Sequence, residues 1–167
     1  MKSIALSKGY EAIVDDCDYL VLSKMKWHVV VCPYNLVYAV RRQKINGKII
    51  NIMMHRFILG LIGNKKFQVD HINGNGLDNR RSNLRPCTDQ QNKFNMKKRS
   101  DNTSGYKGVS WLPDRKRWQA QIQINKKNSR IGRFLSKVEA ANAYDKRAVE
   151  LFGEFAKLNF KGGASSD

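Results

Sequence analysis

The stretch from Val69 to Asn92 holds side chains that together could hydrolyse a phosphate ester. Asp70 and Asn92 offer carboxylate and amide oxygens, which are hard ligands suited to Mg²⁺ or Mn²⁺ rather than to zinc. With two protein ligands, such a cation keeps positions for phosphate oxygens and water, where it can stabilise developing negative charge. The imidazole of His71, with an ordinary pKa of about 6.5, can accept a proton from water near neutral pH. The residue types therefore predict a single-metal hydrolytic site.

A hairpin followed by a helix would bring these side chains together. Neighbouring side chains of a regular strand face opposite ways, so we expect the strand to break where Asp70 meets His71. The glycines that follow make such a break easy. A structural interpretation, in which Asp70 caps the backbone and His71 packs beside it, stays open for this pair alone. The expected elements are a strand over 67–69, a turn over 73–76, a returning strand over 83–87 and a helix capped by Thr88 or Asp89.

The same stretch resembles the ββα-metal motif of HNH endonucleases, in particular the HNH homing endonucleases of phages and mobile introns. The resemblance rests on "DH" at 70–71, "NLR" at 83–85 and "QN" at 91–92, in the order and spacing of that family. The pair "HR" at 55–56 also resembles one that lies upstream of the motif, so His55 is a further candidate without an assigned role.

The resemblance implies a role for each matched residue. Asp70 and Asn92 would hold one Mg²⁺ or Mn²⁺ ion, and His71 would be the general base. Asn83 would bridge the hairpin by hydrogen bonds and keep His71 oriented for catalysis.

The C-terminal third shows the patterns of a small sheet and one helix. We expect strands over 106–111, 117–125 and 129–135, and a helix that starts at the capping box "SKVE" (136–139) and ends at Gly153. Alternation along the second strand gives one apolar face and one face lined by amides. The apolar residues are Trp118, Ala120, Ile122 and Ile124, and the amide residues are Gln119, Gln121, Gln123 and Asn125.

The segments "YKGVSW", "RWQAQI", "IGRF" and "EAANAYDKRAVELFG" resemble the APETALA-type (ethylene-response-factor) DNA-binding domain of plants. That resemblance implies a three-stranded sheet that enters the major groove, where Gln and Asn suit adenine and Arg suits guanine. Several base-reading Arg and Trp positions of the plant domains differ, so no sequence preference carries over. The differing positions are Ser110, Leu112, Gln121, Gln123 and Arg130.

The charge distribution indicates a polyanionic partner. The chain carries a formal net charge of +17, with seven basic and no acidic residues over 41–66 and twelve basic residues over 93–133. Such clustering favours nucleic acid first and an anionic membrane surface second. The basic stretches lack a clear amphipathic face with large apolar anchors, so we expect binding to double-stranded DNA and not to a membrane. The candidate DNA contacts are Arg41, Arg42, Lys97, Lys98, Arg99, Lys107, Arg115, Lys116, Arg117, Gln119, Gln121, Gln123 and Arg130.

Cysteine use and the absence of targeting signals indicate the compartment. The three cysteines are widely spaced and form no C-x-x-C pair, which argues against a disulfide framework and a structural zinc site. The N-terminus has no signal-peptide core, and no apolar run is long enough to cross a membrane. We expect a cytoplasmic protein of a bacterial or phage-infected cell.

These patterns predict an α+β fold with two domains. The expected ranges are 1–94 for a β-rich block with the HNH motif, 95–104 for a basic linker, 105–160 for the APETALA-type domain and 161–167 for a flexible tail. We expect a monomeric, site-directed homing endonuclease that nicks one DNA strand with one metal ion and no small-molecule cofactor. The alternative is a non-catalytic DNA-binding regulator with a decayed nuclease domain.

Overall fold

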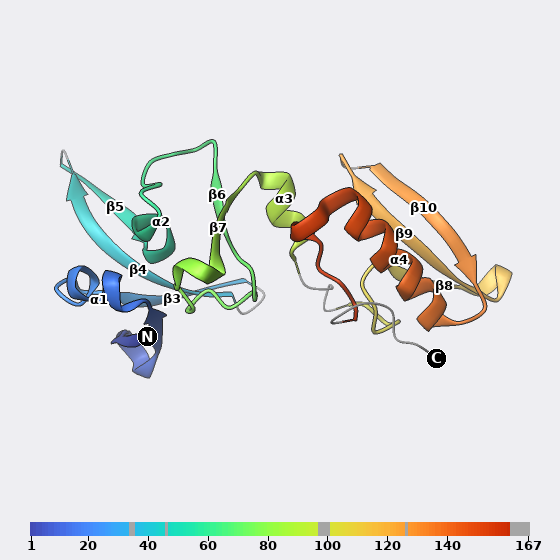
Figure 1. Cartoon of the computed structure of the whole chain (residues 1–167), viewed down its shortest axis with the longest axis horizontal. Coiled ribbons are helices and arrows are strands. Elements are labelled where there is room, and N and C mark those ends of the chain that lie inside the picture. The colour runs from blue at the N-terminus through green and yellow to red at the C-terminus, as the bar shows by residue number, and fades with distance from the viewer. Residues whose placement is uncertain (34–35, 46, 97–100, 126, 161–167) are drawn as a thin grey trace. The chain divides into compact units, whose positions relative to one another are not determined.

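The computed structural model describes residues 1–33, 36–45, 47–96, 101–125 and 127–160, and the chain divides into two compact units, Met1–Asp89 and Gln90–Asp167 (Figure 1). Several small antiparallel sheets and a few helices make up both units, which confirms the α+β prediction. Within the described ranges, no helix is long and apolar enough to cross a membrane.

The N-terminal unit contains two hairpins, one three-stranded sheet and two short helices. The sheet has the order β3-β4-β5, and β1 pairs with β2 and β6 with β7. The elements of the N-terminal unit are β1 (Lys2–Ala5), 3-10 helix η1 (Ser7–Gly9), β2 (Glu11–Val14), α1 (Asp16–Leu22), β3 (His28–Cys32), β4 (Leu36–Ile45), β5 (Lys48–Met53), α2 (Met54–Ile58), β6 (Gln68–His71), 3-10 helix η3 (Arg81–Asn83) and β7 (Leu84–Cys87).

One apolar core joins these elements. Val14, Leu22 and Met54 are almost completely buried in it, and Val69 and Leu84 bring the β6–β7 hairpin to the same cluster. Burial of such side chains stabilises a fold by about 1.5–3 kcal/mol each, so the core anchors the hairpin that carries the predicted site. The β1–β2 hairpin, with two strands of four residues each, was not expected from the sequence.

The β6–β7 hairpin corrects one expectation. The strand does not break before His71, because Asp70 pairs with Arg85 and His71 pairs with Leu84 in a continuous antiparallel ladder. The turn begins after His71 instead. Asp70 contacts Arg85 across the ladder, and the ring of His71 contacts those of His55 and Tyr38.

The C-terminal unit is a three-stranded antiparallel sheet of order β10-β9-β8 with α4 across one face (Figure 1). This arrangement and the Ser136–Glu139 capping box were both expected, and both are present. Helix α3 begins at the last residue of the N-terminal unit, Asp89, and the rest of it belongs to the C-terminal unit. The elements are α3 (Asp89–Phe94), β8 (Val109–Leu112), 3-10 helix η4 (Pro113–Arg115), β9 (Arg117–Ile124), β10 (Lys127–Phe134), α4 (Lys137–Phe152) and 3-10 helix η5 (Gly153–Phe155).

The first strand of this sheet starts later than the sequence predicted. Residues 106–108 form a turn, in which Gly108 has a φ of +75° and lies under the ring of Tyr144. A Cβ at this position would come within 2.1 Å of that ring. The strand therefore begins only at Val109.

The segment around the expected linker is tied to the C-terminal unit. Phe94, the last residue of α3, stacks on Phe152 of α4 with ring centroids 3.5 Å apart. The Nζ atom of Lys107 donates hydrogen bonds to the carbonyl oxygens of Phe94 and Met96, at 2.6 and 2.8 Å. Residues 97–100 of the expected linker and the expected tail, 161–167, lie outside the described residues.

Candidate active site

Asp70 forms a buried ion pair with Arg85 on the β6–β7 hairpin. Both Nε and Nη2 of Arg85 donate to Oδ2 of Asp70, at 2.9 and 2.7 Å. The two side chains are 6% and 11% exposed. Because Asp70 and Arg85 face each other across the ladder, the pair fixes the direction in which the carboxylate points.

His71 ends β6 and is buried among other rings. Its imidazole centroid lies 4.9 Å from that of His55 and 6.0 Å from the ring of Tyr38. Burial lowers the pKa of His71 below its ordinary value, although a polar contact with Asn79 and the charges of Asp70 and Asp78 oppose that shift. A neutral imidazole is the form that can accept a proton.

Asn83 joins the two ends of the turn between β6 and β7. Its Oδ1 accepts a hydrogen bond from the backbone of Asn73 at 2.9 Å, and its Nδ2 donates to the carbonyl oxygen of Asp78 at 2.7 Å. Its own carbonyl oxygen accepts from the backbone of Ile72 at 2.9 Å. The side chain thus bridges the hairpin just after His71.

The other polar residues of the turn are mostly structural. The side chains of Asn73 and Asn75 each accept a hydrogen bond from the backbone two residues ahead. Such local bonds shape turns, which explains why the stretch is rich in Asn. Arg81 ties the turn to α1 through a bidentate contact, in which its Nε and Nη2 donate to the two carboxylate oxygens of Asp18, each at 2.8 Å. The turn therefore has its own supports, independent of any ligand.

Asn92 lies in α3, which begins at Asp89, and falls on the far side of the division between the two units. Its assignment as a ligand therefore rests on its sequence spacing. Within the described residues, no three His, Cys, Asp or Glu side chains gather into a cluster that could hold a metal ion by themselves. Asp70 itself suits a hard divalent cation, because it is an oriented anionic oxygen donor.

Sequence analysis missed three neighbours of the predicted site: Tyr38, Asn79 and Arg85. Arg85 stands directly opposite Asp70, so knowledge of the hairpin register would have revealed it. Tyr38 and Asn79 carried no comparable signal, because β4 and the turn meet His71 only through the tertiary fold. His55 had been noted without a role, and the structure places it against His71.

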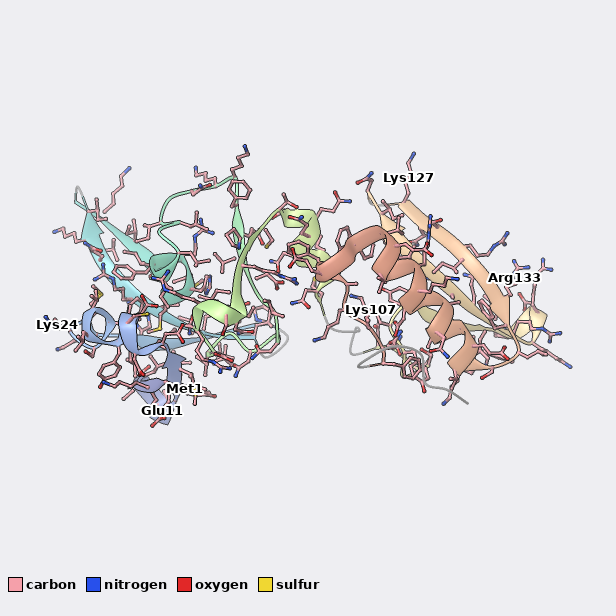
Figure 2. All side chains as sticks on the ribbon, viewed as in Figure 1. Met1, Glu11, Lys24, Lys107, Lys127 and Arg133 are labelled. Atoms are coloured by element: carbon pink, nitrogen blue, oxygen red, sulfur yellow. The ribbon has the colours of Figure 1, made fainter. Side chains whose placement is uncertain are left out.

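The outer face of the C-terminal sheet brings together many of the predicted DNA contacts. Directly paired residues of an antiparallel sheet project to the same face. Arg133, which projects from β10 (Figure 2), was not predicted as a DNA contact. Partial desolvation and the nearby cations of Arg115 and Arg130 lower the pKa of its guanidinium group. The pairs on this face are Gln119 with Arg133 and Ser110, Gln121 with Arg130, and Gln123 with Asn128.

The remaining basic candidates differ in their surroundings. Arg42, Arg115, Lys116 and Arg117 are exposed. Arg41 is half-buried, with its guanidinium over the rings of Trp27 and Phe57 at 5.9 and 5.4 Å, so its main contacts are with the core.

Lys107, which Figure 2 labels, is corrected from a DNA contact to a structural residue. Its ammonium group donates hydrogen bonds to two carbonyl oxygens. Burial and the charge of Lys157 lower the pKa of that group to about 8. Lys97, Lys98 and Arg99 lie outside the described residues.

Comparison with known proteins gives the family. The HNH endonuclease family matches residues 58–94, which include β6, β7 and α3. A protein of Acanthamoeba polyphaga mimivirus, described as an uncharacterized HNH endonuclease, is 36% identical over 156 residues, which cover 91% of this chain and 76% of the viral protein. Protein 3.8 of Escherichia phage T7 is 37% identical over 95 residues, covering 56% of this chain and 77% of the phage protein. No solved structure matches. The chain belongs to the HNH endonuclease family.

Proposed function

We propose that this protein hydrolyses phosphodiester bonds of double-stranded DNA, with His71 as the general base. The observation that carries the proposal is the position of His71: a buried imidazole at the end of β6, beside Asp70, within the part of the chain that matches the HNH family. Its lowered pKa keeps it neutral at physiological pH, so it can take a proton from the attacking water. Asn83 bridges the turn and keeps the end of β6 in place.

Asp70 and Asn92 are proposed to hold one Mg²⁺ or Mn²⁺ ion. Asp70 fits this role because Arg85 fixes its carboxylate, and Asn92 has the matching position in the sequence. When bound, such a cation stabilises the negative charge that develops on the phosphate and on the departing oxygen. Arg85 has a second task here, because it balances the buried charge of Asp70 when no cation is bound.

The C-terminal sheet is proposed to bind DNA through its outer face, as the resemblance to the APETALA-type domain implies. Arg130 and Arg133 of β10 lie on that face beside three Gln side chains of β9, a combination that suits both phosphates and base edges. The net charge of +17 supports a polyanionic partner. A monomer with one such site makes one strand cut per encounter, so we propose nicking by a homing endonuclease.

Cleavage of a supercoiled plasmid library, carrying fragments of candidate host and phage DNA, tests the proposal. With Mg²⁺ or Mn²⁺, we expect nicked circles to appear before linear products and EDTA to stop the reaction. His71→Ala should lower the cleavage rate by about 10²–10⁴-fold, the usual contribution of a general base. His28→Ala is the matched control, because His28 lies on β3 and has no predicted role in the site. Equal cleavage by wild type and His71→Ala would show that the base is misassigned.

A further inference from the structure

Three aromatic rings from three separate elements meet at the proposed base. Tyr38 comes from β4, His55 from α2 and His71 from the end of β6. Each ring contacts the other two, with centroid distances of 5.6 Å for Tyr38–His55, 6.0 Å for Tyr38–His71 and 4.9 Å for His55–His71. Ring pairs at 4.5–7 Å interact with a preferred geometry, so such a cluster restricts the orientation of every member.

The contact between the two imidazoles is the closest of the three. His55 and His71 meet edge to face, with an interplanar angle of 89°. The torsion that turns an imidazole about its Cβ–Cγ bond is broad in the absence of neighbours, so the neighbours decide where the ring points. His55 therefore limits the rotation of the ring that must face the attacking water.

His55 is itself well placed to act as a rigid support. It lies in the first turn of α2 and is only 7% exposed. Met54 and Ile58 of the same short helix are buried in the apolar core, so they hold the helix in place. Its Nδ1 is buried without a hydrogen-bond partner among the described residues, so its contact with His71 is one of ring packing. Burial, with smaller effects from His71 and Arg56, lowers the pKa of His55 to about 3, so the ring stays uncharged near neutral pH.

Tyr38 packs against the turn of the β6–β7 hairpin. Gly76, in the turn after β6, lies so close to β4 that a Cβ would come within 2.3 Å of the carbonyl oxygen of Val37 and 2.7 Å of the Tyr38 ring. Only a residue without a side chain allows this approach. The turn that follows His71 therefore packs directly on the ring that contacts His71.

We propose that His55, supported by Tyr38, is a positioning residue for His71: its edge-to-face contact fixes the plane of the catalytic imidazole. His55 does not touch the reacting phosphate in this role, and it acts only through His71. The inference rests on the proposed function of His71 as the base, but its structural part, the restriction of the His71 ring, does not.

Two variants of His55 separate ring packing from other roles. His55→Ala removes the ring, so we expect kcat for DNA cleavage to fall by about 10–100-fold, as for other small misplacements of catalytic groups. The KM for DNA should stay within about 2-fold, because His55 makes no contact with the substrate. His55→Phe keeps the ring and removes the unpartnered nitrogen, so kcat should return to within about 3-fold of wild type.

Ile58→Ala is the matched control for stability. Ile58 lies in the same helix, is 7% exposed like His55, and packs in the core cluster. It should lower the melting temperature at least as much as His55→Ala while leaving kcat near wild type. A loss of kcat that follows the melting temperature across all three variants would overturn the proposal.

The orientation of His71 can be measured without any cleavage assay. Three-bond coupling constants across the Cβ–Cγ bond of His71, from NMR of the selectively labelled protein, report whether the ring keeps one orientation. We expect one ring orientation in wild type and His55→Phe, and averaging in His55→Ala. A single ring orientation in His55→Ala, or a His55→Phe variant as inactive as His55→Ala, would overturn the positioning role. If His71→Ala cleaves normally while these couplings behave as expected, the assignment of the base fails and the ring contact stands.

Discussion

The two units of this protein place their polar side chains in opposite ways. Around the β6–β7 hairpin, the N-terminal unit buries an ion pair and imidazole and amide groups: His55, Asp70, His71, Asp78, Asn79 and Asn83. Among the described residues of the C-terminal unit, only Asn95 and Ser104 are buried polar residues, while its Gln and Arg side chains line an open sheet face. Chemistry needs groups that are desolvated and fixed, whereas recognition of a polyanion needs groups that can reach it.

The difference between the two units can be tested most directly at Arg85. Arg85→Leu leaves Asp70 buried without its guanidinium partner, so we expect a loss of about 3–5 kcal/mol in the free energy of unfolding. Urea denaturation of the metal-free protein measures this loss. Mn²⁺ should raise the melting temperature of Arg85→Leu more than that of wild type, because the cation would compensate the Asp70 charge.

Arg130→Leu provides the control on the exposed face, where we expect a change within about 0.5 kcal/mol. Equal stability losses for Arg85→Leu and Arg130→Leu would contradict the difference between the two units. Failure of Mn²⁺ to act on Arg85→Leu would count against Asp70 as a ligand.

Acid should weaken the N-terminal unit through His55. Its pKa is about 3 in the folded protein and about 6.5 when unfolded, so below pH 6.5 the unfolded chain binds the additional proton. The stability is fully present above about pH 6.5 and is lost progressively as the pH falls towards 3. Near pH 5 the loss from this residue is about 2 kcal/mol.

Urea titrations at pH 7 and pH 5 test this expectation. His55→Phe removes the titrating group, so its stability should change less between these pH values than that of wild type. The same pH sensitivity in both proteins would mean that other groups, such as His71, account for the acid effect.

The outer sheet face should respond through DNA binding and not through stability. Arg130→Gln combined with Arg133→Gln should weaken DNA binding about 10-fold at moderate salt, and lower the slope of log affinity against log salt by about two. Fluorescence anisotropy over a salt series measures both quantities. The control pair Lys146→Gln and Arg147→Gln removes the same charge from α4, on the other side of the sheet. Equal effects of the two pairs would indicate binding by net charge alone.

The smallest effect is expected at the start of α4. Ser136→Ala removes the hydroxyl that accepts a hydrogen bond from the backbone of Val138 at 3.1 Å, and should cost about 1 kcal/mol. Thermal unfolding measures the change, and Ser129→Ala on β10 is a control without a capping role. A null result for Ser136→Ala would mean that tertiary packing, and not the cap, sets the beginning of this helix.

Much of the C-terminal fold was predictable because its signals are local. The alternation along β9 and the capping box of α4 involve residues two to four positions apart, and both predicted elements are present. The resemblance of this unit to the APETALA-type domain stays a prediction. The late start of β8 escaped prediction because residues 106–108 turn before it, where Gly108 has a positive φ and lies against Tyr144, far along the chain.

The candidate site was predictable only in part. The spacing of Asp70, His71 and Asn83 marked the stretch as an HNH motif, and the family match confirms that family. The expected break between Asp70 and His71 was wrong, because the ladder with Arg85 and Leu84 holds the strand straight through both residues. Asn92 stays a prediction from its spacing.

The sequence by itself determined the polar motif, the elements that carry it and the excess of positive charge, because each of these depends on residue type and short-range spacing. The tertiary structure alone decided the surroundings of the two key groups. Arg85 faces Asp70 because of the hairpin register, and Tyr38 and His55 reach His71 because β4, α2 and β6 pack on one core. Such side-chain contacts depend on how distant elements pack, and no local pattern in the chain encodes them.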